Sequence, residues 1–206
     1  MPSRKRKATD YEQEDLFDAE SADADATADE ADADATTLAE GQIYDFITET
    51  PVQDSPTERT LQAVARSLVE EYGFDRSQLR RDQTITYDAT TEEGRPRKGR
   101  QKVGIAVYLA DSAQETSDDI IRVCMVQPPN TKASDRRKGV LSLEEVLGVL
   151  PRCDYGLWTN GTDLVFWQKI TGPLLLQPDY QDLYDMPGKD ETAADLDSPD
   201  RQARRP

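Results

Sequence analysis

The chain has 206 residues, enough for one compact domain with flanking segments, and its 41 acidic and 25 basic side chains give a net charge of −16. It contains no histidine, and its two cysteines form no Cys-x-x-Cys pair, which excludes histidine-dependent catalysis and a structural zinc site. No apolar run reaches the length of about 18 residues needed for a membrane span, and no apolar segment follows the basic start, so we expect a cytoplasmic protein without a signal peptide.

The acidity lies in the flanking segments. Residues 1–49 carry 15 acidic and 4 basic groups and residues 171–206 carry 8 and 4, whereas residues 50–170 carry 18 and 17. From Glu20 to Ala35 the sequence is a low-complexity run without large apolar residues, so it cannot bury enough surface to offset the entropy of ordering. We therefore expect residues 1–49 to be a disordered acidic tail, either a solubilising arm or one that mimics nucleic acid or binds a basic partner.

The first helix is expected to begin after Ser55. Ser55 is a typical N-cap residue, Pro56 suits the first helical position, and Glu58 completes the spacing of a capping box. Apolar residues then recur at three- and four-residue spacing as far as Tyr72, and Gly73 is a typical helix stop.

Strand-like runs follow this helix. They are Gln83–Asp88, Val103–Leu109 and Ile120–Val126, the last of which ends at two prolines. Ser142 again stands at capping-box spacing and predicts a second helix, which Pro151 ends.

Two more runs, Tyr155–Thr159 and Asp163–Lys169, flank Asn160-Gly161, a pair typical of a type I′ hairpin turn. This order of elements indicates an α/β fold with a mixed sheet flanked by helices. From Gln177 onward the chain is polar and contains proline, so we expect a folded domain over residues 50–176 and a polar tail over residues 177–206.

Four short phrases of the sequence resemble the N-terminal domain of type I restriction enzyme R subunits. They are Glu49-Thr50-Pro51-Val52, Glu70-Glu71-Tyr72-Gly73-Phe74, Leu79-Arg80-Arg81-Asp82 and Tyr155-Gly156-Leu157-Trp158-Thr159-Asn160-Gly161. The resemblance implies the restriction-endonuclease-like fold of the PD-(D/E)XK superfamily and a role in restriction-modification or phage defence. It also implies double-stranded DNA and separate methylase and motor subunits as partners.

Nucleases of that fold hold Mg²⁺ in a cluster of carboxylates, with a lysine beside the attacked phosphate. The resemblance places the helical glutamate on Glu58, but it places the strand aspartate on Gly104, the second glutamate on Met125 and the lysine on Gln127. Only Glu58 is retained, and its capping-box spacing explains it without a metal. We therefore expect no metal, no cofactor and no efficient cleavage, with Mg²⁺ required only if the nuclease is active.

A glutamine and a tyrosine that the family often carries on the next helix fall on Glu145 and Val149.

Two alternative functions stay open. One is a Mg²⁺-dependent endonuclease whose ligands have migrated to carboxylates near the predicted strand ends: Asp88, Asp111, Asp118 and Asp119. The other is an interaction protein that acts through its acidic tail.

Nine basic side chains crowd two predicted loops and are candidate phosphate contacts: Arg95, Arg97, Lys98, Arg100 and Lys102 in the first, and Lys132, Arg136, Arg137 and Lys138 in the second. Such clusters give sequence-independent affinity for nucleic acid, although solvated loops have the same composition. The sequence therefore predicts a catalytically degenerate nuclease-fold module that binds DNA or a partner subunit.

Overall fold

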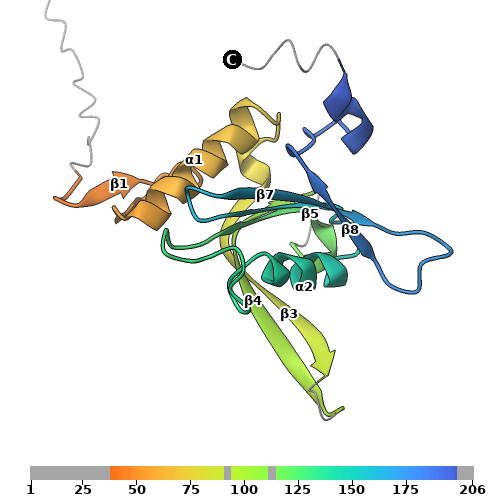
Figure 1. Ribbon diagram of the computed structural model, residues 1–206. Coiled ribbons are helices and arrows are strands. Elements are labelled where there is room, and N and C mark those ends of the chain that lie inside the picture. The colour runs from red at the N-terminus through yellow and green to blue at the C-terminus, as the bar shows by residue number, and fades with distance from the viewer. Residues whose placement is uncertain (1–37, 91–93, 111–114, 199–206) are drawn as a thin grey trace, which may run out of the picture. The chain divides into compact units, whose positions relative to one another are not determined.

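The centre of the protein is a six-stranded mixed sheet with one helix on each face (Figure 1). The computed structural model describes residues 38–90, 94–110 and 115–198. The sheet has the order β3-β4-β5-β6-β7-β8, and its strands are Leu79–Thr90, Pro96–Tyr108, Ile120–Val126, Tyr155–Thr159, Leu164–Ile170 and Asp179–Leu183. Neighbouring strands are antiparallel except β5 and β6, which are parallel.

Shorter elements surround the sheet. Strands β1 (Gln42–Tyr44) and β2 (Pro51–Gln53) form a separate antiparallel pair. Single 3-10 turns stand at Arg76–Gln78, Ser117–Asp119 and Ala193–Asp197. None of the helices in the described residues is long and apolar enough to cross a membrane. The predicted mixed α/β fold is confirmed.

Helix α1 (Pro56–Glu70) begins where the sequence predicts. The Ser55 hydroxyl accepts a hydrogen bond from the Glu58 backbone N–H at 3.1 Å, and the helix packs Leu61 and Leu68 against the sheet. Gly73 follows the helix with φ of +75°, a conformation that glycine adopts without steric cost. Only the Ser55 half of the expected capping box forms, because the Glu58 carboxylate accepts hydrogen bonds from Gln62 and Arg81 instead.

Helix α2 (Leu141–Val149) connects the parallel strands β5 and β6 and covers the opposite face of the sheet. The prediction that Ser142 caps this helix is wrong. The helix begins at Leu141, after Val140, two residues earlier than a Ser142 cap would place it, and the buried Ser142 hydroxyl instead donates to the Gly139 carbonyl at 2.6 Å. At the other end, the buried Lys169 ammonium donates to the carbonyls of Leu147 at 3.2 Å and Leu150 at 2.5 Å.

The hairpin of β6 and β7 is confirmed, but its turn is not of type I′. Thr159 pairs with Leu164, so four residues rather than two form the loop. Gly161 has φ of +89°, whereas Asn160 is not among the residues with positive φ and uses its side-chain oxygen to accept the Thr162 N–H at 2.9 Å.

The folded segment is longer than expected at both ends. Within the expected acidic tail, residues 38–49 include β1 and the buried Asp45, and the rest of that tail lies outside the described residues. Within the expected C-terminal tail, β8 extends the sheet, and Met186 and Leu196 are buried. The few apolar residues of this polar segment do not recur at a helical or strand spacing, which explains why the sequence did not predict this packing.

Strands β3 and β4 are also much longer than expected. They pair from Leu79↔Val107 to Thr90↔Pro96, whereas β4 pairs with β5 only from Ile105 onward. Residues 83–90 and 96–103 therefore project beyond the rest of the sheet as a two-stranded ribbon, called here the β3–β4 ribbon (Figure 1). The expected first basic loop is thus mostly a strand.

Candidate functional site

A pocket of about 470 Å³ lies between the N-terminal turn of α1 and the base of the β3–β4 ribbon. Glu58 lines it from the helix, and Arg81, Lys102 and Gly104 line it from the two strands. The basic loop after β5 closes one side with Arg137 and other residues. We call this cavity the site pocket.

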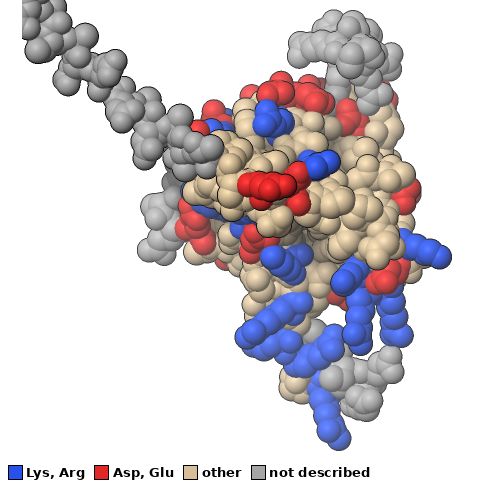
Figure 2. Space-filling view, turned by 90° about the vertical axis from the view of Figure 1, so that its left-hand side faces the viewer, with Lys and Arg blue, Asp and Glu red and all other residues tan. Residues whose placement is uncertain are grey.

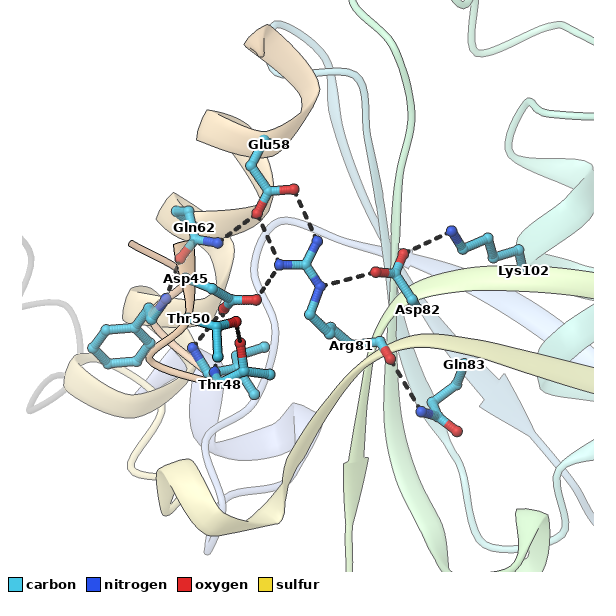
Figure 3. Close-up of polar contacts among 11 residues, drawn as sticks. Asp45, Thr48, Thr50, Glu58, Gln62, Arg81, Asp82, Gln83 and Lys102 are labelled. Carbon is cyan, nitrogen blue, oxygen red and sulfur yellow. Dashed lines mark hydrogen bonds and ion pairs between the residues drawn. The ribbon is translucent and has the colours of Figure 1, made fainter. Parts of the chain in front are cut away.

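The guanidinium of Arg81 lies at the centre of this site and is bonded to three carboxylates (Figure 3). Its two terminal nitrogens donate to the two Glu58 oxygens at 3.0 and 2.9 Å, and one of them also donates to Asp45. Its Nε donates to Asp82 at 2.8 Å, and the other Asp82 oxygen pairs with Lys102 Nζ at 2.8 Å. These five side chains form what we call the Arg81 cluster.

The cluster is fixed in place by groups behind it. Gln62 Nε2 donates to Glu58 at 2.6 Å, and the Gln62 carbonyl oxygen accepts the Phe46 backbone N–H at 2.6 Å. Asp45 accepts the Ile47 N–H at 2.7 Å and has a side chain with no exposed surface. The carboxylate positions are therefore set by the α1 helix and the β1–β2 connection together.

The surroundings favour the charged forms of these carboxyl groups. Burial by itself raises the pKa of Asp45, but the hydrogen bonds from Arg81 and from the Ile47 N–H outweigh burial and lower it. Asp82 behaves in the same way, since burial is outweighed by hydrogen bonds from Lys102 and Arg81 and its pKa is lowered. Burial opposes the charge of Arg81, yet the carboxylates around it raise its pKa, so the guanidinium stays protonated.

The positions carried over from the nuclease resemblance are only partly brought together. Glu58, Gly104 and Gln127 line the site pocket. Met125 does not, because its side chain is fully buried on the α2 face, where its sulfur lies 3.6 Å from the Ser142 hydroxyl oxygen. The expectation that all four positions would meet at one edge is therefore wrong for Met125.

The two helix positions also lie away from the Arg81 cluster. The Glu145 carboxylate accepts a hydrogen bond from the Tyr87 hydroxyl at 2.8 Å, and Val149 is 39% exposed. Neither residue lines the site pocket.

The donor set does not suit a divalent metal ion. Mg²⁺ is held by several free oxygen ligands, but the carboxylates of Asp45, Glu58 and Asp82 are oriented on Arg81. Gly104 offers no ligand, and a Cβ atom there would lie 3.1 Å from the Val126 side chain. Across the three described ranges, no group of three or more Asp, Glu, Cys or His residues is arranged to hold a metal.

The carboxylates considered as migrated ligands lie elsewhere. Asp88 pairs with Lys98 at 2.5 Å on the ribbon, and Asp119 accepts the Thr116 hydroxyl at 2.7 Å beside Asp118 in a 3-10 turn. None of these three lines the site pocket, and Asp111 lies outside the described residues.

The candidate phosphate contacts gather on one part of the surface. All nine are exposed, and Figure 2 shows basic side chains concentrated around the projecting β3–β4 ribbon. Arg97, Lys98, Arg100 and Lys102 belong to β4, Arg95 precedes it, and the other four belong to the loop between β5 and α2.

Hydrogen bonds fix the loop between β5 and α2. Asp135 accepts the backbone N–H groups of Arg137 at 2.9 Å and Lys138 at 2.8 Å, which lowers the pKa of Asp135. The Lys138 carbonyl accepts the indole N–H of the buried Trp158 at 2.7 Å, so the loop is tied to the core.

Sequence reasoning missed the residue at the centre of the site. Arg81 stood in one of the family phrases without an assigned role, and Asp45 fell in the expected tail. No sequence pattern marked Arg81, and the strand irregularity beside it, where Asp82 adopts φ of +57°, is visible only in the structure.

Fold and site together define a small mixed α/β protein with an ion-paired site at the foot of a basic ribbon. The chain belongs to the family described as type I restriction enzyme R protein N terminus, which matches residues 56–187. No curated protein and no solved structure matches the chain. The family match gives the protein a restriction-modification context.

Proposed function

We propose that this protein is a DNA-binding module of a type I restriction-modification system that keeps a nuclease-like sheet but does not cleave DNA. The observation that carries the proposal is the Arg81 cluster, in which a protein cation binds Glu58, the one carboxylate that matches a nuclease metal ligand, together with Asp45 and Asp82. The same pocket opens onto the basic ribbon and loop.

The absence of cleavage follows from the ligands. Nuclease metal ions lower the pKa of a bound water and stabilise the charge of the transition state, and both effects need carboxylates free to bind the metal. Releasing Glu58 or Asp45 would break hydrogen bonds to Arg81 and leave a guanidinium, 18% exposed, with one carboxylate partner fewer. Such a loss costs several kcal/mol, which opposes metal binding.

DNA binding follows from the local charge, which differs in sign from the charge of the whole chain. Residues 94–102 hold five basic and no acidic groups, and residues 127–140 hold four basic and one acidic group, for net charges of +5 and +3. Cations spaced over one surface displace counterions from the phosphate backbone and bind duplexes of any sequence. Methylase and motor subunits remain proposed partners in the same system.

The test measures binding and cleavage with the full chain. Fluorescence anisotropy of a labelled 30-base-pair duplex should report saturable binding that weakens roughly 100-fold between 50 and 200 mM salt if about four phosphates are contacted. Plasmid DNA with Mg²⁺ or Mn²⁺ should stay uncut. Cleavage that disappears in Glu58→Gln or Asp82→Asn would overturn the non-cleaving assignment, and lack of any duplex binding would overturn the DNA-binding assignment.

A further inference from the structure

The β3–β4 ribbon has two different faces. On the inner face, Ile85 and Val103 are buried, and they pack in the core cluster on the α2 side of the sheet. The Tyr87 ring covers Gly99, where a Cβ atom would lie 2.4 Å from the ring, and the Tyr87 hydroxyl donates to Glu145 of α2. The inner face is therefore committed to the fold.

The outer face is polar and exposed from Thr84 to Asp88 on β3 and from Lys98 to Lys102 on β4. It alternates with the inner face and carries Thr84, Thr86 and Asp88 on β3 opposite Lys102, Arg100 and Lys98 on β4. The face has three cations, one carboxylate and two hydroxyls. Lys98 pairs with Asp88 and Lys102 with Asp82, but Lys98 and Lys102 are each 67% exposed, so both pairs can exchange for other anions at little cost.

We propose that the outer face of the β3–β4 ribbon enters the major groove of a B-form DNA duplex. This inference rests on the proposed DNA-binding function and names the element and the groove that carry it. The ribbon is the part of the basic surface that projects from the sheet, so it reaches into a groove (Figures 1 and 2). The loop between β5 and α2 instead lines the site pocket with Arg137 and Lys138.

The dimensions fit. Two paired strands lie about 4.8 Å apart, and a two-stranded ribbon is narrow enough for the major groove, which is about 12 Å wide. The eight residues from Pro96 to Val103 that pair only with β3 span about 26 Å at about 3.3 Å per residue. The minor groove, about 6 Å wide, does not admit the ribbon.

The side chains also match what the major groove offers. An arginine such as Arg100 can donate two hydrogen bonds to the O6 and N7 atoms of guanine, and threonine can bond to base edges or contact the thymine methyl group. Lys98 and Lys102 flank Arg100 at two-residue spacing on the same face and are placed for the phosphates on either side. The ties of Tyr87 to α2 and of Gln101 to the Arg137 carbonyl hold the ribbon at a fixed angle.

The experiment compares two charge-matched variants of the full chain. Lys98→Gln with Arg100→Gln removes two positive charges from the ribbon, and Lys132→Gln with Lys138→Gln removes two from the loop between β5 and α2. We expect the ribbon variant to lose at least tenfold in duplex affinity, to lower the salt slope by about 2, and to lose protection of guanine N7 from dimethyl sulfate. The loop variant should keep the N7 protection. Circular dichroism serves to check that both variants remain folded.

A second arm tests the groove with the unaltered chain. A duplex containing glucosylated 5-hydroxymethylcytosine, whose sugar fills the major groove, should bind at least tenfold more weakly, and netropsin in the minor groove should not compete. Duplex binding that tolerates the glucose, or unchanged N7 protection in the ribbon variant, would overturn this inference and leave the proposed function standing. Tighter binding of single-stranded DNA or RNA than of duplex would overturn it too. A chain that binds no nucleic acid overturns both.

Discussion

Replacing Arg81 by methionine should destabilise the protein strongly at neutral pH. The change keeps most of the apolar length of the side chain but leaves the Asp45 carboxylate, whose side chain has no exposed surface, and the Glu58 carboxylate, 12% exposed, without their cation. Removing one partner of a buried ion pair costs about 3 to 5 kcal/mol, and the Ile47 N–H that still donates to Asp45 places the expected loss near the lower end, at about 3 kcal/mol.

The pH dependence gives this prediction a second test. Because Arg81 holds the pKa of Asp45 below its ordinary 3.8 in the folded state, the stability from this contact is present above that value and is lost as the pH falls through the folded-state pKa. Without Arg81, burial remains as the larger influence and raises the pKa of Asp45. The difference between variant and parent should therefore shrink as the pH falls from 7 to 4.

Urea unfolding followed by the fluorescence of the buried Trp158 measures both quantities. The matched control is Arg80→Met, since Arg80 pairs with Glu115 in an exposed contact with side chains 37% and 46% accessible, and its loss should cost less than about 1 kcal/mol. Equal losses for the two variants, or a loss for Arg81→Met below about 1 kcal/mol at pH 7, would refute a stabilising Arg81 cluster.

Three further predictions concern single contacts. Lys169→Met should lower the free energy of unfolding by about 2 kcal/mol, because two carbonyls at the end of α2 lose their donor. In the same urea assay, the control Lys189→Met, which breaks a partly exposed pair with Asp75, should change it by less than about 1 kcal/mol. Met125→Glu should cost about 3 kcal/mol or more by burying a carboxylate, whereas Gln127→Lys on the pocket wall should change stability by less than about 0.5 kcal/mol. Similar thermal melting temperatures for the two variants would contradict a buried Met125 and a pocket-lining Gln127. Burial and the Glu145 hydrogen bond raise the pKa of Tyr87 to about 12, so Glu145→Gln should lower it in an ultraviolet titration, with Tyr87→Phe assigning the signal; an unchanged titration would argue against this contact.

Sequence signals such as helix caps and prolines located the elements whose ends are set by residues close to them in the chain. The N-cap at Ser55 with Pro56 located α1, and the β-branched run ending at two prolines located β5 to the residue. By contrast, the second capping signal failed at Ser142 because a turn of the preceding loop already satisfies the helix start, which only the tertiary structure reveals.

The site was harder to predict because its contacts are distant in sequence. Arg81 meets Glu58 from 23 residues away and Asp45 from 36 residues away, and no pattern of spacing encodes such pairs. Three positions that the resemblance singled out, Glu58, Gly104 and Gln127, line one pocket. The resemblance misplaced Met125. In a continuous strand, Met125 and Gln127 would lie on the same face, because strand side chains alternate. β5 ends at Val126, so Gln127 lies outside this alternation and need not share the face of Met125.

A cation supplied by a side chain differs from a bound ion in one further respect. Arg81 cannot dissociate, so its occupancy does not vary with metal concentration, and a chelator such as EDTA has nothing to remove. Its charge also does not change over any pH the cell reaches, because the surrounding carboxylates raise its pKa further above neutrality. The positive charge at the centre of the pocket is therefore part of the chain itself and is present whenever the chain is folded.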